Sequence, residues 1–222
     1  MAQKTATIIG ATGLIGSHLL QQLQVSDAFN TIKVIGRRTA GYKNPKTEEL
    51  IIDFEDKAAF KEAIRGSHVV FCAVGTTNKK VSGNKTAYRK VDFDIPVNAA
   101  RFAAETGCNT FAVVSAVGAD SNSKNFYTRL KGEMEDAIQQ QNIPTLLIFR
   151  PSLLLGKRNE TRIGESLGKW IMKPLSFLIP ARMKPIEAED VAKAMVHATN
   201  SDLIGVHFFH YPEIKNYAKL QT

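Results

Sequence analysis

Near the N-terminus, a short apolar strand pattern passes directly into a glycine-rich turn and then into an amphipathic helix pattern. The strand pattern is Ala6–Ile9, the turn reads Gly10-Ala-Thr-Gly13-Leu-Ile-Gly16, and the helix pattern covers Leu14–Leu23. In this context Gly10 permits a tight turn, Gly13 lets the backbone approach a pyrophosphate, and Gly16 lets the helix pack on the strand. The helix N-terminus adds unpaired N–H groups and the positive end of its dipole. The turn therefore predicts a dinucleotide phosphate site, against the alternative of a tight turn without a ligand.

The alternation of strand and helix patterns continues along the chain. Strands are expected at Ala6–Ile9, Ile32–Ile35, Leu50–Ile52, Val69–Ala73, Thr110–Val114, Thr145–Phe149 and Val206–His210. Helices are expected at Leu14–Leu23, Lys57–Ile64, Asp94–Glu105 with Asp94 as its N-cap, Asn125–Gln141 and Asp190–Thr199. Because strands and helices alternate, the chain predicts a parallel sheet with helices on both faces and right-handed crossovers. The expected fold class is α/β: a doubly wound parallel β-sheet, or Rossmann fold, formed by residues 1–222 as a single domain.

After Pro151 the pattern loosens, and residues 156–186 contain a tryptophan and several prolines without a clear strand period. We expect this insertion to form a small C-terminal cap on the substrate side, over the carboxyl edge of the sheet. Within it, the apolar segment Gly164–Met172 fits a core helix, a dimer face or an interfacial membrane anchor. Peripheral membrane contact and the choice between monomer and homodimer therefore stay open.

Composition excludes several classes of protein. The chain has 29 Lys and Arg against 21 Asp and Glu, but no dense basic block interleaved with aromatic residues, so no specific nucleic-acid binding is expected. No apolar run approaches the roughly 18 residues of a membrane span, and no transmembrane segment is expected. The five histidines show no ligand spacing, so we expect no metal. Two cysteines in apolar stretches, Cys72 and Cys108, and no visible secretory signal predict a cytoplasmic location.

Two arginines follow the second strand pattern, about 20 residues beyond the glycine turn, where the ribose of an adenine dinucleotide should arrive. Arg37 and Arg38 suit a 2′-phosphate better than a neutral diol, because arginine forms bidentate, charge-assisted hydrogen bonds to phosphate. The expected cofactor is therefore NADP(H); the alternative is two solvated arginines in a surface loop. Asp53 and Phe54 close the next strand and are further candidates for the cofactor site. Asp53 could equally cap the following helix.

A serine, a tyrosine and a lysine form the candidate catalytic group. Ser115 ends a predicted strand at the carboxyl edge of the sheet, and Tyr127 and Lys131 lie four residues apart on the next helix. Residues at that spacing share a helix face, so both side chains can point at one site. A phenol with a pKa near 10 is a poor acid–base group at neutral pH, and a neighbouring ammonium favours its ionised form. The three residues predict proton transfer to or from a substrate oxygen.

With these residues placed, nearly the whole chain resembles the small atypical short-chain dehydrogenase/reductases of the Tat-interacting oxidoreductase group. The shared segments are Gly10–Gly16, Ile35–Arg38, Asp53–Phe54, Gly75–Thr77, Val91–Asp92, Ser115, Gly118–Asp120, Asn125–Tyr127, Lys131–Glu133 and Phe149–Pro151.

The resemblance implies that Tyr127 is the general acid, that Ser115 orients the substrate oxygen, and that Lys131 also holds the nicotinamide ribose. It implies a cofactor site at Gly10, Thr12, Gly13, Leu14, Ile15, Gly16, Arg37, Arg38, Asp53, Phe54, Ala73, Gly75, Thr76, Tyr127 and Lys131. One departure is Asp92, which stands where extended relatives carry the Asn of a proton relay. It could act through water or cap a helix, and we favour the cap.

Three functions compete. The first is an NADPH-dependent reductase of a small carbonyl substrate, and the second is an NADPH-binding redox sensor or regulatory scaffold with little turnover. The third is sugar-nucleotide epimerase or dehydratase chemistry, for which the stretch after Pro151 is short. The intact Ser115, Tyr127 and Lys131 favour the reductase.

Overall fold

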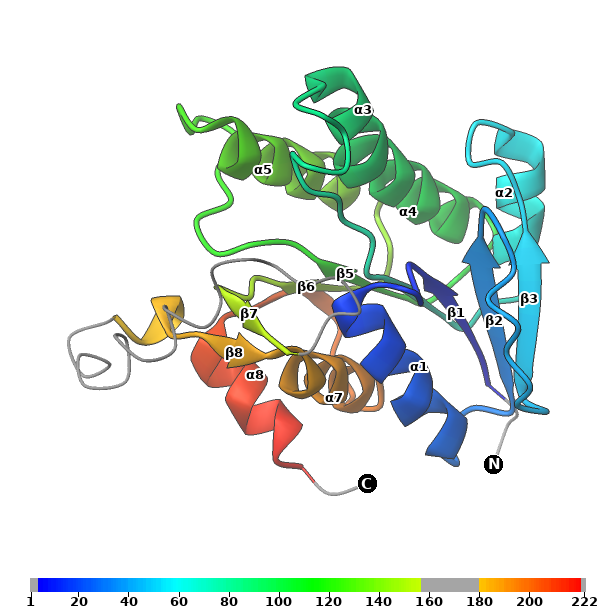
Figure 1. The fold of residues 1–222 in the computed structure, drawn as a ribbon. Coiled ribbons are helices and arrows are strands. Elements are labelled where there is room, and N and C mark those ends of the chain that lie inside the picture. The colour runs from blue at the N-terminus through cyan, green and yellow to red at the C-terminus, as the bar shows by residue number, and fades with distance from the viewer. Residues whose placement is uncertain (1–3, 157–179, 221–222) are drawn as a thin grey trace.

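A seven-stranded parallel sheet forms the centre of the molecule, with the strand order β3-β2-β1-β4-β5-β6-β9 (Figure 1). The computed structural model describes residues 4–156 and 180–220. The strands are β1 Thr5–Ile9, β2 Thr31–Gly36, β3 Thr47–Ile51, β4 Val69–Cys72, β5 Thr110–Val114, β6 Thr145–Phe149 and β9 Gly205–Phe209. The order reverses between β1 and β4, which is where doubly wound sheets open a crevice for ligands. The predicted doubly wound α/β fold is confirmed.

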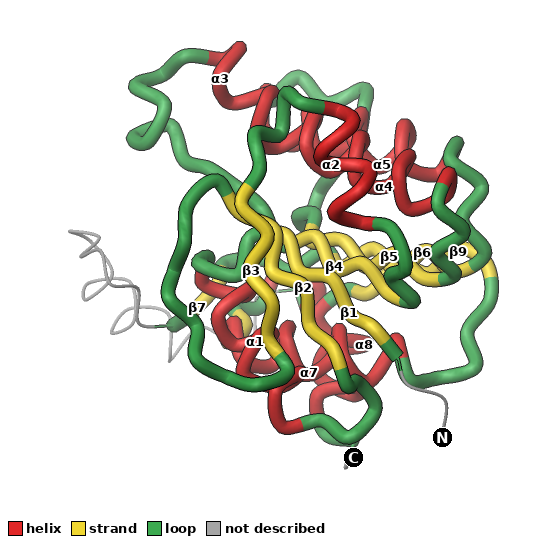
Figure 2. The backbone as a smooth tube through the Cα atoms, turned by 90° about the vertical axis from the view of Figure 1, so that its right-hand side faces the viewer, coloured by secondary structure: helices red, strands yellow, loops and turns green. Residues whose placement is uncertain are grey.

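Helices cover both faces of this sheet, as the two views in Figures 1 and 2 show. One face carries α1 Leu14–Val25, α7 Ala188–Thr199 and α8 Tyr211–Ala218. The other carries α2 Lys57–Ile64, α3 Lys85–Arg89, α4 Ile95–Glu105 and α5 Phe126–Gln139.

Alternate residues of the inner strands β1, β2, β4, β5 and β6 belong to two separate apolar cores. Ile8 packs into the core that contains Leu19 of α1, whereas its neighbour Ile9 packs into the core that contains Phe102 of α4 and Ile138 of α5. All four residues of β4 are buried. Burial on both faces explains why these strands read as continuous apolar runs rather than as alternating ones.

The helix expected to start at Asp94 is preceded by further helical structure. The helical structure begins with α3, whose N-cap Asn84 accepts a hydrogen bond from the Ala87 N–H. A π-helical segment, η1 (Lys90–Asp94), then connects α3 to α4. Asp94 has helical backbone angles and its side chain forms no cap hydrogen bond. The predicted Asp94 cap is therefore wrong, because the chain enters the helical path ten residues earlier, at Asn84.

A small second sheet joins the two ends of the predicted insertion. Strand β7 (Leu154–Leu155) pairs in parallel with β8 (Ile186–Glu187), and a short 3₁₀ helix, η2 (Ala181–Met183), precedes β8. The segment Gly164–Met172 lies outside the described residues. Within the ranges that the structure describes, no helix is long and apolar enough to cross a membrane.

Candidate functional site

Two adjoining cavities form a groove along the carboxyl edge of the sheet. One has a volume of about 340 Å³ and the other about 510 Å³, and Gly13 and the segment 73–76 line both. The smaller cavity extends over the ends of β2 and β3, and the larger one over the end of β5 and the start of α5. The groove therefore spans the point where the strand order reverses.

The glycine turn lies at the centre of the groove. Gly10 has φ of +95°, and a Cβ atom built there would lie 2.8 Å from the backbone carbon of Ala73. A Cβ atom at Gly16 would overlap the Gly10 carbonyl oxygen. Helix α1 begins after Gly13 without a side-chain cap. Bare backbone and a helix N-terminus thus face the groove, an arrangement that suits a pyrophosphate.

The smaller cavity holds most of the residues predicted for the adenosine end. Arg37, Arg38 and Phe54 line it, and the Phe54 ring packs edge-on against Phe60 at 4.9 Å. Asp53 is not among its lining residues; its Oδ1 accepts a hydrogen bond from the Glu55 N–H at 3.0 Å.

The alternative role considered for Asp53, as cap of the following helix, is wrong. The cap of α2 is Asp56, whose side chain accepts hydrogen bonds from the N–H groups of Ala58 and Ala59.

The wall of this cavity contains one acidic residue that the sequence analysis missed. Glu49 Oε2 accepts hydrogen bonds from the Thr39 hydroxyl and the Ala40 N–H, each at 2.8 Å, and Oε1 accepts one from the Tyr42 N–H at 2.6 Å. The Ala40 and Tyr42 N–H groups hold the pKa of Glu49 below its usual range. Glu49 thereby fastens residues 39–42 beside the two arginines. Its position in an unremarkable strand sequence gave no signal.

The larger cavity brings together all three candidate catalytic residues. Ser115, Tyr127 and Lys131 line it. Asn125 caps α5 by accepting hydrogen bonds from the N–H groups of Tyr127 and Thr128, which fixes where the helix starts. Tyr127 is 40% exposed. Ser115 Oγ is buried and has no hydrogen-bond partner among the residues that the structure describes.

Lys131 is buried and forms an ion pair with Asp92, whose Oδ1 lies 3.0 Å from Lys131 Nζ. Burial acts to lower the pKa of Lys131, but the Asp92 carboxylate, together with Tyr127, raises it above its ordinary value. The other oxygen of Asp92 accepts a hydrogen bond from the Thr76 N–H at 2.8 Å. Asp92 lies within η1 and caps no helix, so the favoured cap interpretation is wrong.

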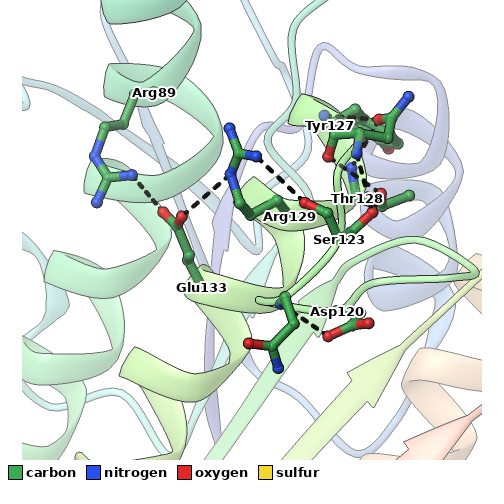
Figure 3. Close-up of polar contacts among 9 residues, drawn as sticks. Arg89, Asp120, Ser123, Tyr127, Thr128, Arg129 and Glu133 are labelled. Atoms are coloured by element: carbon green, nitrogen blue, oxygen red, sulfur yellow. Dashed lines mark hydrogen bonds and ion pairs between the residues drawn. The ribbon is translucent and has the colours of Figure 1, made fainter.

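Polar contacts hold the first turns of α5 against neighbouring segments (Figure 3). Glu133 accepts a hydrogen bond from Arg89 of α3 at 2.7 Å and also pairs with Arg129 at 3.8 Å. The hydroxyl groups of Ser123 and Thr128 lie 2.7 Å apart. These contacts fix the helix that carries Tyr127 and Lys131.

A second tyrosine, Tyr88, connects α3 to the site and was also missed. Its hydroxyl donates a hydrogen bond to the Thr76 carbonyl at 3.3 Å, and its ring meets the Tyr127 ring edge-on at 6.4 Å. The signal available in the sequence was weak, because α3 spans only five residues, Lys85–Arg89.

The comparison with protein families agrees with this geometry. A family model described as NAD(P)H-binding matches residues 10–202. Among relatives, the protein FMP52, mitochondrial, of Candida albicans is 31% identical over 89% of this chain and 89% of its own length. Protein HTATIP2 of Rattus norvegicus is 34% identical over 76% of this chain and 70% of its own length.

Solved structures share the fold at low sequence identity. The Bordetella bronchiseptica enzyme WbmH in complex with NAD⁺ superposes with a TM-score of 0.72 and 18% identity, over 94% of this chain and 76% of that one. A UDP-N-acetylglucosamine 4-epimerase from Methanobrevibacter ruminantium has a TM-score of 0.71 and 16% identity, over 95% and 77%.

One expectation is overturned by the relatives. The FMP52 proteins of Candida albicans and of Debaryomyces hansenii, the latter 35% identical over 90% of this chain, are named as mitochondrial proteins. The cytoplasmic location inferred from two cysteines and the absence of a visible secretory signal is therefore contradicted, since neither observation distinguishes one reducing compartment from another. The expected resemblance, in contrast, is confirmed: this chain belongs to the NAD(P)H-binding family, alongside HTATIP2 and FMP52, and has the fold of the short-chain dehydrogenase/reductases.

Proposed function

We propose that this protein is an NADPH-dependent oxidoreductase that reduces a small carbonyl compound, with Tyr127 as the general acid. The observation that carries the proposal is the shared cavity of Ser115, Tyr127 and Lys131, which adjoins the cavity lined by Arg37 and Arg38. A nicotinamide dinucleotide is an elongated ligand with an anionic pyrophosphate at its centre. The groove has the two arginines at one end, the glycine turn at its centre and the candidate catalytic residues at the other end, in the order that such a ligand requires.

Two features of the chain fit such a cofactor. Any side chain at Gly10 would collide with the backbone of Ala73, so the turn leaves backbone alone at the centre of the groove. Ser115 Oγ is buried without a partner among the described residues, although buried hydroxyls are normally hydrogen-bonded. A ligand oxygen in the larger cavity would satisfy that hydroxyl.

The proposed roles of the residues are compatible with their positions. A bound NADPH supplies a hydride. Ser115 donates a hydrogen bond to the carbonyl oxygen of the substrate and orients it, while Tyr127, whose side chain is partly exposed in the cavity, donates the proton that this oxygen takes up. Lys131 holds the nicotinamide ribose from its buried position on the same face of α5.

The choice of NADPH over NADH rests on Arg37 and Arg38, both of which line the smaller cavity. Arg37→Ala should weaken NADPH binding by roughly 10-fold or more, because a charge-assisted hydrogen bond to phosphate is lost, and should leave NADH binding nearly unchanged. Fluorescence titration with each cofactor measures both dissociation constants. The matched control is Arg65→Ala at the C-terminal end of α2, where an exposed arginine pairs with Glu62 outside the groove. Equal losses for the two cofactors would contradict the assignment.

Turnover is tested with a panel of aldehydes, ketones and quinones, followed at the absorbance of the reduced nicotinamide. Tyr127→Phe should still bind NADPH but should lose at least about 100-fold in kcat, the range expected for a general acid. NADPH binding without oxidation by any compound would instead favour the second function, a regulatory protein that binds NADPH.

A further inference from the structure

A lysine from a separate loop joins the two arginines in the smaller cavity. Arg37 and Arg38 follow β2, whereas Lys80 lies in the loop between β4 and α3. Among the residues that the structure describes, these three cations and Glu49 are the charged side chains that line this cavity. The wall of the cavity therefore carries a net positive charge.

The carboxylate in this wall is engaged by neutral donors. Glu49 accepts hydrogen bonds from the Thr39 hydroxyl and from the N–H groups of Ala40 and Tyr42. Its two oxygens thus hold the segment 39–42 in place. An anion that enters the cavity meets three cations and a single carboxylate, which is the charge balance that a phosphate group requires.

The loop that carries Lys80 is folded on itself by backbone hydrogen bonds. The N–H groups of Lys80 and Val81 donate to the Thr77 carbonyl at 2.9 and 3.3 Å, and the Gly83 N–H donates to the Asn78 carbonyl at 3.0 Å. At the base of the loop, Thr76 and Asp92 are joined by the hydrogen bond described above. Lys80 therefore borders the cavity from a defined backbone position.

The two cavities divide this loop between them. Thr77 and Asn78 line only the larger cavity, whereas Lys80 lines only the smaller one. The glycine turn, where a pyrophosphate is expected, borders both cavities through Gly13. A cation that served the pyrophosphate should border both cavities as well. The position of Lys80 beside the arginines points instead to a phosphate at the adenosine end.

We propose that Lys80 is a third ligand of the 2′-phosphate of NADPH, which it holds from the β4 side of the cavity while Arg37 and Arg38 hold it from the β2 side. A phosphate monoester carries roughly −1.5 to −2 charges at pH 7, more than one guanidinium neutralises. The lysine ammonium binds phosphate as a point charge and needs no planar geometry. This inference rests on the proposed use of NADPH and adds a specificity-determining residue to it.

The first test compares the binding of two cofactors. Lys80→Met removes the charge and keeps an unbranched side chain, and isothermal titration calorimetry measures its dissociation constants for NADPH and NADH. NADPH binding should weaken by roughly 10-fold, because a charge-assisted contact is lost, while NADH binding should stay within about two-fold of the wild type. Lys80→Arg, which restores the charge, should recover most of the NADPH affinity. The matched control is Lys79→Met, since Lys79 is exposed and lines neither cavity.

A second measurement identifies the phosphate that Lys80 contacts. The protein is saturated with 2′,5′-ADP, and the ³¹P resonances of its two phosphates are followed as the pH changes. A nearby cation lowers the second pKa of a phosphate, so Lys80→Met should raise the pKa of the bound 2′-phosphate and leave that of the 5′-phosphate nearly unchanged. A larger rise at the 5′-phosphate would overturn the inference, because Lys80 would then serve the pyrophosphate position.

The remaining outcomes separate this inference from the proposed function. Equal losses of NADPH and NADH in Lys80→Met, or no loss of either, would overturn the role of Lys80. If Arg37→Ala still discriminates between the cofactors in that case, the proposed use of NADPH stands without Lys80. If neither variant discriminates, the assignment of NADPH fails together with the inference. Because Lys80 is exposed, its substitution should leave the fold intact, and NADH binding confirms this in the same experiment.

Discussion

At the scale of single residues, the missing side chain of Gly132 determines how closely α5 approaches the loop before it. A Cβ atom there would overlap the backbone of Asp120 and Ser121. Gly132 directly follows Lys131, so this close approach also fixes the depth of the buried ion pair.

Gly132→Ala should lower the free energy of unfolding by at least about 1–3 kcal/mol, the usual cost of overpacking. Urea denaturation measures this change. Asp136→Ala, at an exposed position of the same helix, is the control and should stay within about 0.5 kcal/mol of the wild type. Equal unfolding free energies of the two variants would contradict this prediction, because the loop at Asp120 and Ser121 would then move aside without loss of stability.

Single polar residues were also the least predictable from the sequence. Asp53, Asp56, Asp92 and Asp94 all precede or lie near helix starts, and each is a plausible cap by residue type. In the structure Asp56 caps α2, whereas Asp92 enters a buried ion pair. Capping depends on local backbone geometry, and ion pairing depends on a residue 39 positions away, so composition around each aspartate could not separate the two.

At the scale of elements, apolar runs and glycines predicted the sheet well. Strand β5 and helix α2 match their predicted bounds, because burial on both faces leaves an unambiguous continuous run and because charged residues mark the exposed face of the helix. The bounds of α4 were predicted to within one residue, but the helical segments before it, α3 and η1, were missed. They carry few apolar residues and are held by contacts distant in sequence.

The segment 39–42 is likewise held by a residue outside it, because Glu49 accepts its hydrogen bonds. Glu49→Gln should release the segment, because a neutral amide holds the Ala40 and Tyr42 N–H groups more weakly than a carboxylate does. Hydrogen exchange at these two amides should accelerate, and binding of 2′,5′-ADP should weaken. Glu48→Gln, at the exposed neighbouring position, is the control. Unchanged exchange in Glu49→Gln would contradict the role of Glu49.

The same contact gives a pH dependence with a defined sign. The pKa of Glu49 is lowered in the folded protein, chiefly by the Ala40 N–H. The stabilisation that ionised Glu49 contributes is therefore fully present above the ordinary ionisation range of a glutamate. It is lost as the pH falls through the lowered pKa that Glu49 has in the folded protein. The protection factor of the Ala40 amide, which is its exchange rate relative to the intrinsic rate at the same pH, should accordingly be fully present at neutral pH and fall only in acid.

At the scale of the whole molecule, the sheet separates two cores that share no side chains. Leu19 belongs to the core on the α1 side and Ile138 to the core on the α5 side. Each change to alanine should cost about 2–5 kcal/mol of unfolding free energy. Because the sites share no contacts across the sheet, the double variant should lose the sum of the two within about 0.5 kcal/mol.

Urea unfolding followed by far-ultraviolet circular dichroism and by tyrosine fluorescence measures these losses. The two signals should change together if residues 1–222 unfold as one cooperative unit, as the sequence predicts for a single domain. Separate transitions for the two variants would show that the layers on either side of the sheet unfold independently.

The wall shared by the two cavities, Gly13 and residues 73–76, has a consequence for affinity. A ligand that fills both cavities behaves as two joined fragments, and the second fragment binds at the high effective concentration set by its link to the first. Neither half has to bind tightly by itself. Adenosine-type and nicotinamide-type fragments should each bind weakly and at the same time, and only the intact dinucleotide should combine their affinities.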